Sequence, residues 1–448
     1  MSGSPAEVLE AEAAEAAQRR VAGALYDAGL RAGDRVLFSR GSSALLLVCV
    51  LGALRSGIVP VLLNATLLRG ERDVLVADAE PTLTVWDDAG LAALAEGDER
   101  ELAPYPLARP MHYTSGTTGR AKGVWSGVLD EADAAALFED EAGLWGFDRA
   151  DTHLVCSPMY HSVSIRFAAG TLLRGGRLVI LPRFDPGSAS EAVRRWRPTT
   201  TFVAPTALGR WLRADDDPAL FADFRLVVHA GSPCPEPVKR AAVARARPGT
   251  VWEFYGSTEG QFTVCSPQEW DERPGTVGRA RPGRRLRVDA GAVVWCRAPS
   301  FARFSYWRDE AATAAAWNGD EFTVGDLGRL DDDGYLFLEG RREDLVISGG
   351  VNVYPAEVEA ALVEVPGVVE VAVFGVSDES WGERVCAAVV GGVDEAALRS
   401  HAERALAPYK RPKTYVAVPE LPRTATGKLR RRALPALLGL EPPPASAS

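Results

Sequence analysis

The feature that most constrains the fold is an alternation of short β-branched segments with longer segments of helical pattern. Near the amino end the short segments cover residues 35–38, 58–63 and 83–86, and similar segments follow at 177–181, 201–206 and 226–233. A chain that alternates in this way builds parallel sheets covered by helices. The sequence therefore predicts an α/β fold whose large amino-terminal domain is rich in parallel strands.

Two stretches near the amino end depart from this alternation. Residues 6–30 are rich in Ala and Glu and carry Val21, Leu25 and Leu30 at helical spacing, which predicts a surface helix. Residues 87–110 are brief and polar, and we expect them to form a simple connection.

A charged stretch led by glycine, Gly340-Arg341-Arg342-Glu343-Asp344, divides the chain. After it, strand segments at 369–376, 384–390 and 414–418 alternate with helical segments, the first of which is opened by Pro355. An ordinary surface charge cluster is the alternative interpretation. We predict domains at 1–340 and 341–448, the second a small, mobile α+β domain with its hinge near 341–344.

Composition excludes several classes of partner. The chain has 448 residues and a formal net charge of −10, so its overall charge does not attract nucleic acids or anionic membranes. The six cysteines form no CxxC pair, and the longest apolar segment near the amino end, 44–54, is too short to span a bilayer. We expect a reduced cytoplasmic protein without structural zinc, membrane insertion or a nucleic-acid partner.

Hydroxyl residues and glycines gather at residues 113–124, which read YTSGTTGRAKGV. Backbone amides and hydroxyls in such a stretch can surround a polyphosphate. The spacing excludes a Walker A loop, because Lys122 is followed by Gly123 instead of Ser or Thr. Taken alone, the stretch fits a mobile loop equally well. The candidate phosphate ligands are Thr114, Ser115, Gly116, Thr117, Thr118, Gly119 and Lys122.

Three further segments offer groups for a nucleotide. Gly231, Ser232 and Pro233 follow a buried strand and leave little side-chain bulk at its carboxyl end, where open parallel sheets bind ligands. Residues 254–260, FYGSTEG, combine aromatic rings, a glycine, hydroxyls and a carboxylate that suits Mg²⁺. Asp326 stands between glycines and is followed by an acidic turn at 331–334. Each segment is also consistent with an ordinary turn.

Two more segments each end on a basic side chain, His161 in the first and Lys428 in the second. The strand at 153–157 runs into a turn with Tyr160 and His161, and residues 421–428, LPRTATGK, end on Lys428. A lone histidine is most often a satisfied core residue, and a lone lysine is most often solvated. Neither residue would be singled out without its context.

In this order and in this combination, the motifs resemble those of the adenylate-forming superfamily, which includes the acyl-CoA synthetases, standalone adenylation enzymes and firefly luciferase. The resemblance covers nearly the whole chain. Ala121 stands where the family usually has proline, and the phosphate loop lies nearer the amino end than is usual. The resemblance implies an acyl-CoA synthetase that uses ATP, Mg²⁺ and coenzyme A to activate a carboxylic acid.

The resemblance also implies a role for each motif. Thr258 would contact the α-phosphate, Glu259 would bind Mg²⁺, His161 would gate the carboxylate site, and Lys428 would bridge the α-phosphate and the attacking carboxylate. The remaining candidates contact the nucleotide or coenzyme A: Gly231, Ser232, Pro233, Phe254, Tyr255 and Gly256 near the adenine, Asp326 and Arg341 at the ribose, and Gly349 and Gly350 along the pantetheine tunnel.

Several questions stay open in the sequence. Trp381 and residues 410–413 are candidates for the coenzyme A nucleotide, although solvated basic residues are favoured for the latter. Arg166 needs an anion if it is buried, and a protein carboxylate is favoured over a second substrate carboxylate. The segment from Ser162 to Phe167 is a candidate pocket wall. The oligomeric state is also open.

Three alternative functions are consistent with parts of the sequence. An acyl-AMP ligase that loads a carrier protein would keep every adenylation motif, and a nucleotide-binding sensor without catalysis is a further class. Amino-acid adenylation is disfavoured because residues 156–167 contain no aspartate. The sequences of residues 229–238 and 254–260 most resemble those of bacterial fatty-acid, bile-acid or carnitine-type acyl-CoA synthetases.

Overall fold

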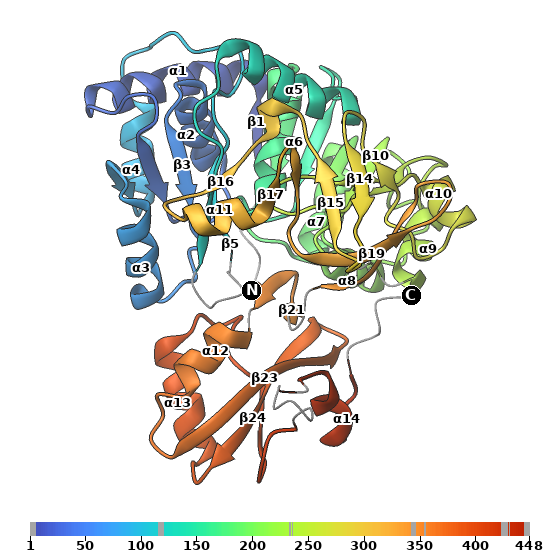
Figure 1. Ribbon diagram of the computed structural model, residues 1–448. Helices are drawn as coiled ribbons and strands as arrows, with labels where there is room; N and C mark the ends of the chain where they lie inside the picture. The colour runs from blue at the N-terminus through green and yellow to red at the C-terminus, as the bar shows by residue number, and fades with distance from the viewer. Residues whose placement is uncertain are drawn as a thin grey trace.

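The computed structural model describes residues 6–442, apart from 115–120, 233, 235, 342–345, 354, 423–428 and 430. It shows a large domain above a separate carboxyl-terminal domain (Figure 1). Two six-stranded sheets form the centre of the large domain. Both are rich in parallel pairs, so the predicted fold class is confirmed.

The first sheet has the order β1-β8-β7-β9-β10-β11. All its pairs are parallel except β1 with β8, and most of its side chains are buried. Its strands are β1 (Glu7–Glu10), β8 (Arg177–Ile180), β7 (Thr152–Val155), β9 (Thr200–Phe202), β10 (Leu226–His229) and β11 (Val251–Glu253).

The second sheet has the order β16-β6-β5-β3-β2-β4. The pairs among β2, β3, β4 and β5 are parallel, whereas β6 and β16 add antiparallel edges. Its strands are β16 (Ser305–Tyr306), β6 (Lys122–Trp125), β5 (Met111–Thr114), β3 (Val59–Leu62), β2 (Arg35–Phe38) and β4 (Leu83–Val85).

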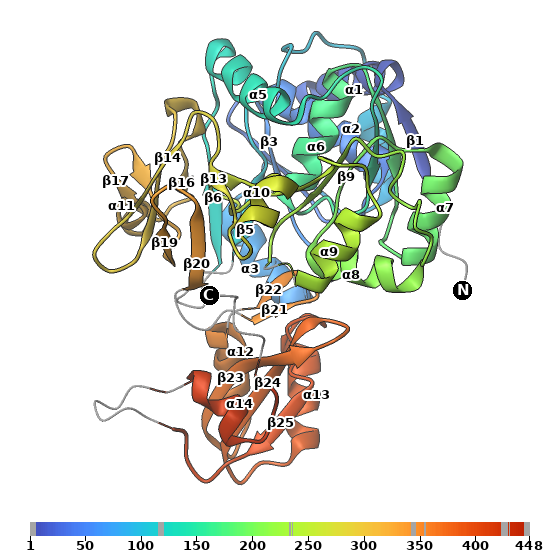
Figure 2. The same ribbon diagram turned by 90° about the vertical axis from the view of Figure 1, so that its right-hand side faces the viewer.

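Helices cover both sheets (Figures 1 and 2). The most deeply buried is α2 (Ala44–Arg55), whose apolar residues from Leu46 to Leu54 face the core and whose first turn is capped by the Ser43 hydroxyl. The other large-domain helices are α1 (Ala11–Asp27), α3 (Arg69–Ala79), α4 (Asp88–Ala95), α5 (Glu131–Trp145), α6 (Ser162–Leu173), α7 (Pro186–Trp196), α8 (Pro205–Ala214), α9 (Glu236–Ala244), α10 (Pro267–Glu272) and α11 (Glu310–Ala316).

Short antiparallel elements complete the large domain. The β19–β20 hairpin, Asp326–Leu330 with Leu336–Arg341, turns through the acidic segment as predicted. The other elements are β12 (Thr263–Val264) with β13 (Arg279–Ala280), the sheet of β14 (Arg285–Val288), β15 (Val294–Arg297), β18 (Glu321–Phe322) and β17 (Trp317–Asn318), and the 3₁₀ turn η1 (Ser300–Ala302).

The carboxyl-terminal domain has hydrophobic clusters of its own on its five-stranded sheet. The predicted strands and the helix opened by Pro355 are confirmed. Cys386, the one cysteine beyond residue 340, is buried in this sheet. The elements are β21 (Val346–Ser348), β22 (Val351–Val353), β23 (Val368–Asp378), β24 (Gly382–Gly391), β25 (Thr414–Ala417), α12 (Pro355–Leu362), α13 (Glu395–Ala405), η2 (Arg431–Ala433) and α14 (Leu434–Leu437).

Two expectations about the amino end are wrong. Residues 7–10 form the edge strand β1 instead of the first turns of a helix, because Val8 and Leu9 pair with β8. The stretch 87–110 contains α4, which is capped by Asp87 and buries Leu91 and Leu94. In both places tertiary packing of a few apolar side chains outweighs the local polar composition.

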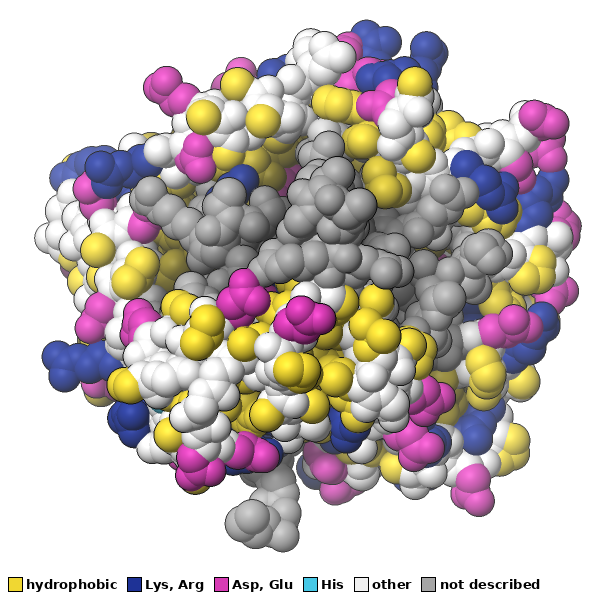
Figure 3. All heavy atoms as spheres, turned by 60° about the horizontal axis from the view of Figure 1, so that its bottom comes forward, with side chains coloured by type: hydrophobic (Ala, Val, Ile, Leu, Met, Phe, Trp, Pro, Cys, Tyr) yellow, Lys and Arg dark blue, Asp and Glu magenta, His cyan; other side chains and the backbone are white. Residues whose placement is uncertain are grey.

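The surface carries mixed charges. On the face formed mainly by the carboxyl-terminal domain, basic and acidic side chains are interspersed with apolar ones (Figure 3). In the described part of the chain, no helix combines the length and the apolar character needed to cross a membrane.

Candidate active site

An open cavity of about 2270 Å³ is lined by residues of both domains. The large domain contributes residues at the carboxyl ends of β3, β5, β10 and β11, together with the start of α6. The carboxyl-terminal domain contributes the β21–β22 turn, Trp381 and Lys410. Ligands of open parallel sheets bind at this edge.

Thr114 and Lys122 lie opposite each other where β5 and β6 leave the sheet. Both line the cavity, and the Nζ atom of Lys122 lies 4.8 Å from the centre of the Tyr306 ring. The intervening candidates, Ser115, Gly116, Thr117, Thr118 and Gly119, lie outside the described residues. The flanking strands therefore hold the two ends of the predicted phosphate loop at one cavity wall.

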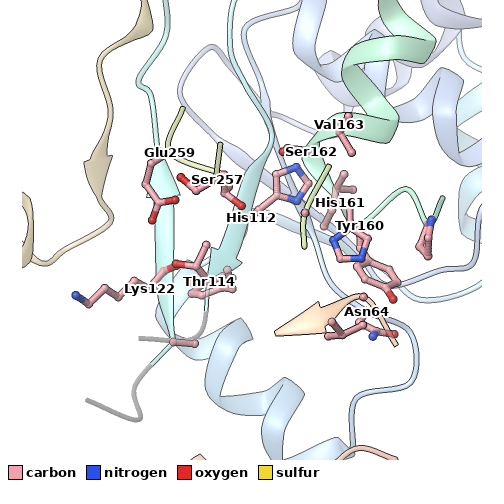
Figure 4. Close-up of a pocket in the computed structure, with 18 of the residues that line it drawn as sticks. Asn64, His112, Thr114, Lys122, Tyr160, His161, Ser162, Val163, Ser257 and Glu259 are labelled. Carbon is pink, nitrogen blue, oxygen red and sulfur yellow. The ribbon is translucent and has the colours of Figure 1, made fainter. Parts of the chain in front are cut away.

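Glu259, Thr258 and Ser257 line the same side of the cavity as Lys122 and Thr114, as Figure 4 shows for the labelled residues. Glu259 is buried, and one of its oxygens accepts a 2.9 Å hydrogen bond from the Tyr306 hydroxyl. The buried Ser257 Oγ has no hydrogen-bond partner among the described residues. The second Glu259 oxygen also has no hydrogen-bond partner in the described part of the chain, and a carboxylate of this kind near an unpartnered hydroxyl fits a Mg²⁺ that takes its other ligands from phosphates and water.

Asp326 is buried at the start of β19 and also lines the cavity. The Tyr255 hydroxyl donates a 2.6 Å hydrogen bond to its Oδ2 atom, which fixes the carboxylate. Phe254, Gly256 and Gly231 line the cavity, whereas Tyr255 and Ser232 do not. Pro233 lies outside the described residues. Of the aromatic pair in the motif, Phe254 is thus the one available for direct contact with a ligand.

His161 lines the cavity at the start of α6, and burial lowers its pKa to about 4. His112 on β5 lies nearby, and burial and the neighbouring His161 lower its pKa to about 3. Neither ring nitrogen of the buried His112 has a hydrogen-bond partner among the described residues. Both rings are neutral at neutral pH, so either can meet a carboxylate only through hydrogen bonds.

His112 and Asn64 were missed by the sequence analysis. Asn64 follows β3, whereas His112 lies inside β5, and these two strands pair in parallel with Leu62 beside His112. A polar residue just beyond the carboxyl end of a parallel strand, such as Asn64, is a usable signal for a site, whereas His112 inside its strand gives none. Tyr306 gives no such signal, because β16 reaches Glu259 only through long-range pairing.

Gly349 and Gly350 form the turn between β21 and β22 and line the cavity. Gly349 has φ +61°, and a Cβ atom there would come within 2.7 Å of the Trp381 ring. The position therefore requires glycine. The side chain of Arg341 and the whole of Lys428 lie outside the described residues.

Lys410 is not a solvated residue, so that expectation is wrong. Its Nζ atom lies 2.6 Å from Glu357 of the same domain and 3.1 Å from Glu71 on α3 of the large domain. Burial alone would lower the pKa of Lys410, but Tyr409, Glu357 and Glu71 outweigh burial and raise it. The charged side chain consequently links the two domains at the edge of the cavity.

Arg166 lines the cavity from α6, and its predicted protein partner is confirmed as Glu141 of α5. The predicted pocket wall is only partly formed as expected, because Ser162, Val163 and Arg166 reach the cavity while Phe167 is fully buried in the core.

The sequence model described as AMP-binding enzyme matches residues 11–106 and 110–294, and that of the AMP-binding enzyme C-terminal domain matches residues 357–428. The chain belongs to the AMP-binding enzyme family. It is an adenylate-forming enzyme of the acid–thiol ligase class, as its curated relatives are.

Two relatives of this AMP-binding enzyme are named for different acids. A 2-succinylbenzoate–CoA ligase of Geobacillus kaustophilus is 35% identical over 375 residues, which are 78% of this chain and 73% of that protein. A long-chain-fatty-acid–CoA ligase of Mycobacterium tuberculosis is 30% identical over 459 residues, which are 93% and 90% of the two chains.

Solved structures share the architecture of the AMP-binding enzyme. A Bacillus subtilis o-succinylbenzoate CoA synthetase with a bound product analogue superimposes with a TM-score of 0.84 at 27% identity, covering 94% of this chain and 92% of that one. The same enzyme with its acyl-adenylate intermediate gives 0.66 at 26% identity and equal coverage. An amide bond synthetase of Marinactinospora thermotolerans gives 0.82 at 27% identity, with 95% and 94% coverage.

Proposed function

We propose that the protein is an acyl-CoA synthetase that activates a carboxylic acid with ATP and transfers the acyl group to coenzyme A. One observation carries the proposal. Candidate nucleotide-binding residues from several segments of the large domain line the same cavity as the glycine turn at 349–350. They are Thr114, Lys122, Thr258, Glu259 and Asp326. A nucleotide and a thiol acceptor would thus meet at one site.

The nucleotide would be held by groups suited to each of its parts. The Asp326 carboxylate, fixed by Tyr255, would accept hydrogen bonds from the ribose hydroxyls. Phe254 and the bare backbone of Gly256 would contact the adenine. Lys122 and the Thr114 and Thr258 hydroxyls would contact phosphate oxygens.

Glu259 is the candidate ligand for Mg²⁺, and the ion would supply positive charge to the phosphates of bound ATP. The hydrogen bond from Tyr306 would keep the Glu259 carboxylate aimed at the cavity. Because Tyr306 also contacts Lys122, one side chain would position both charged groups.

In the first half-reaction a substrate carboxylate oxygen would attack the α-phosphorus of ATP, forming a new P–O bond as the bond to pyrophosphate breaks. The nucleophile belongs to the substrate, so the protein contributes position and charge neutralisation. In the second, the thiol of coenzyme A would lose its proton and attack the acyl carbon, and AMP would leave.

Two features support coenzyme A as the acceptor. Arg183 and Arg210 line the cavity, and neither forms an ion pair with another described residue, so both guanidinium groups are available to phosphates. The higher TM-score with the product-analogue complex than with the acyl-adenylate complex of one enzyme also favours a thioester-forming domain arrangement here.

Replacing Lys410 with methionine should slow thioester formation about tenfold to a hundredfold and leave pyrophosphate release nearly unchanged. The variant leaves the carboxylates of Glu71 and Glu357 facing each other at the domain boundary, which disfavours this arrangement. The two half-reactions would be timed separately by quenched flow. Arg399→Met, which removes an exposed cation paired within α13, is the control, and equal slowing of both steps by Lys410→Met would contradict the proposed link.

The proposed function is tested by mass spectrometry of products formed from MgATP and a panel of aliphatic, aromatic and dicarboxylic acids, with and without coenzyme A. Acyl-CoA that forms only when coenzyme A is present supports the proposal. Acyl-AMP that accumulates regardless of coenzyme A favours an acyl-AMP ligase that loads a carrier protein. The absence of both products with every acid would favour the non-catalytic sensor.

A further inference from the structure

The cavity wall at Arg166 is backed by more positive charge than its protein partners neutralise. Arg166 on α6 and Glu141 on α5 belong to a largely buried group, the inner ionic cluster, which consists of Arg166, Arg281, Arg284, Asp140 and Glu141. Three guanidinium groups share two carboxylates within it. Such an excess inside a protein favours an additional anion.

The carboxylates of the cluster are shared and cannot compensate further. Glu141 accepts from Arg166 at 2.8 Å and lies 3.3 Å from Arg281, and Asp140 lies 2.9 Å from Arg281 and 3.0 Å from Arg284. Burial alone would raise the pKa of Glu141, but Arg166 and Arg281 outweigh burial and lower it. Both carboxylates are therefore already paired within the cluster.

The surroundings of the cluster do not supply the missing charge. Arg109, which faces the same region, donates to the main-chain carbonyl of Arg303 at 2.9 Å instead of to a carboxylate. The Glu259 carboxylate faces Arg109 and is tied to Tyr306 on the phosphate side of the cavity. Among the described residues, the excess positive charge of the inner ionic cluster is thus not neutralised.

Arg166 is the member of the cluster that reaches the cavity. Its Nε and Nη2 atoms are held by Glu141 and Gln261 at 2.8 to 3.1 Å, whereas Nη1 has no hydrogen-bond partner among the described residues. The side chain is 27% exposed, while Arg281 and Arg284 are almost fully buried. One edge of a fixed guanidinium is therefore open to a ligand.

The wall around this edge is apolar. Val163, Phe202, Phe254 and Ala230 line the same cavity, and the Arg166 guanidinium lies 5.7 Å from the centre of the Phe254 ring. An acid with an apolar or aromatic spacer fits such a wall, and a second anionic group at its far end fits the open edge of Arg166.

We propose that the acyl pocket selects dicarboxylic acids, with Arg166 binding the carboxylate that does not react. This inference rests on the proposed acyl-CoA synthetase function and deepens it. Arg166 acts as a specificity-determining residue, and Glu141 and Gln261 position its guanidinium. The opposite carboxylate of the same acid is the one activated by ATP.

The test uses dicarboxylic acids of increasing length. Each is compared with a partner acid, a monocarboxylic acid in which an isopropyl group of similar shape and no charge replaces the distal carboxylate. The wild-type kcat/KM for the best dicarboxylic acid should exceed that for its partner about a hundredfold. Arg166→Gln should lose about a hundredfold with the dicarboxylic acid and stay within about threefold with the partner. Arg166→Lys should restore part of the preference.

Arg174→Gln is the matched control, since Arg174 pairs with Glu139 just beyond α6 and does not line the cavity. Equal wild-type rates with both acids, or an equal loss of both in Arg166→Gln, would overturn the inference. The wild-type comparison needs no variant to fold. Turnover of monocarboxylic acids alone would overturn only the inference, whereas no pyrophosphate release with any acid would overturn the proposed function as well.

Discussion

Replacing Lys239 with methionine should lower the free energy of unfolding of the large domain by about 3–5 kcal/mol. Lys239 on α9 is 1% exposed, and its ammonium forms an ion pair with the buried Glu253 at the end of β11. The substitution leaves that carboxylate without a cation in the interior. His229 lies 3.9 Å from Glu253, but burial lowers its pKa to about 4, so it is not a replacement at neutral pH.

Urea unfolding followed by tryptophan fluorescence measures this loss, because Trp381 alone of the eleven tryptophans lies beyond residue 340. The neighbouring Arg240→Met is the control, since Arg240 is half exposed and its removal should leave the free energy of unfolding nearly unchanged. The double variant Lys239→Met with Glu253→Gln should recover part of the loss. A single-variant loss below about 1 kcal/mol would show that the pair is not a major stabilising contact.

Replacing Lys428 with alanine should reduce adenylate formation by about two orders of magnitude, equivalent to about 3 kcal/mol of barrier, and leave ATP binding intact. The proposed reaction develops negative charge between the attacking carboxylate and the α-phosphate, and a positioned cation stabilises that charge more in the transition state than in the ground state. Pyrophosphate release measures the step, and equilibrium dialysis measures ATP binding.

Supplying a synthetic acyl-adenylate to the Lys428→Ala enzyme separates the two half-reactions. Thioester formation from it should proceed at close to the wild-type rate. Arg404→Ala, which removes an exposed cation from α13, is the control for a general loss of positive charge. Adenylate formation by Lys428→Ala at a rate comparable to wild type would remove Lys428 from the proposed role.

The sequence was sufficient for the parts of the fold that local pattern determines. A run of β-branched residues indicates buried strands such as β10, and two adjacent glycines indicate the turn after β21. The motif residues Thr258, Glu259 and Asp326 could be assigned to one site only through resemblance, because the chain brings them together from distant segments. Edge strand β1 and helix α4 were missed, since their identity depends on the partners against which they pack.

Ion pairs between distant segments were the least predictable features. Lys410 reads as one of several solvated basic residues, and its partner Glu71 lies 339 positions away. The need of Arg166 for an anion was predictable from its position on an apolar helix, and a carboxylate of the protein meets that need in part. The excess charge of the inner ionic cluster is visible only when α5, α6 and the segment after β13 are assembled.

The burial of Cys386 allows the opening of the carboxyl-terminal domain to be followed separately from that of the large domain. Its thiol lies within the sheet of that domain, and burial raises its pKa, so a soluble alkylating reagent reaches the thiolate only through an opening of the sheet. The labelling rate of this one cysteine then measures the local opening equilibrium of the smaller domain alone. A ligand that bridges both domains would slow the labelling. The ratio of the Cys386 labelling rates without and with the ligand would give the free energy by which the bound ligand stabilises the carboxyl-terminal domain against opening.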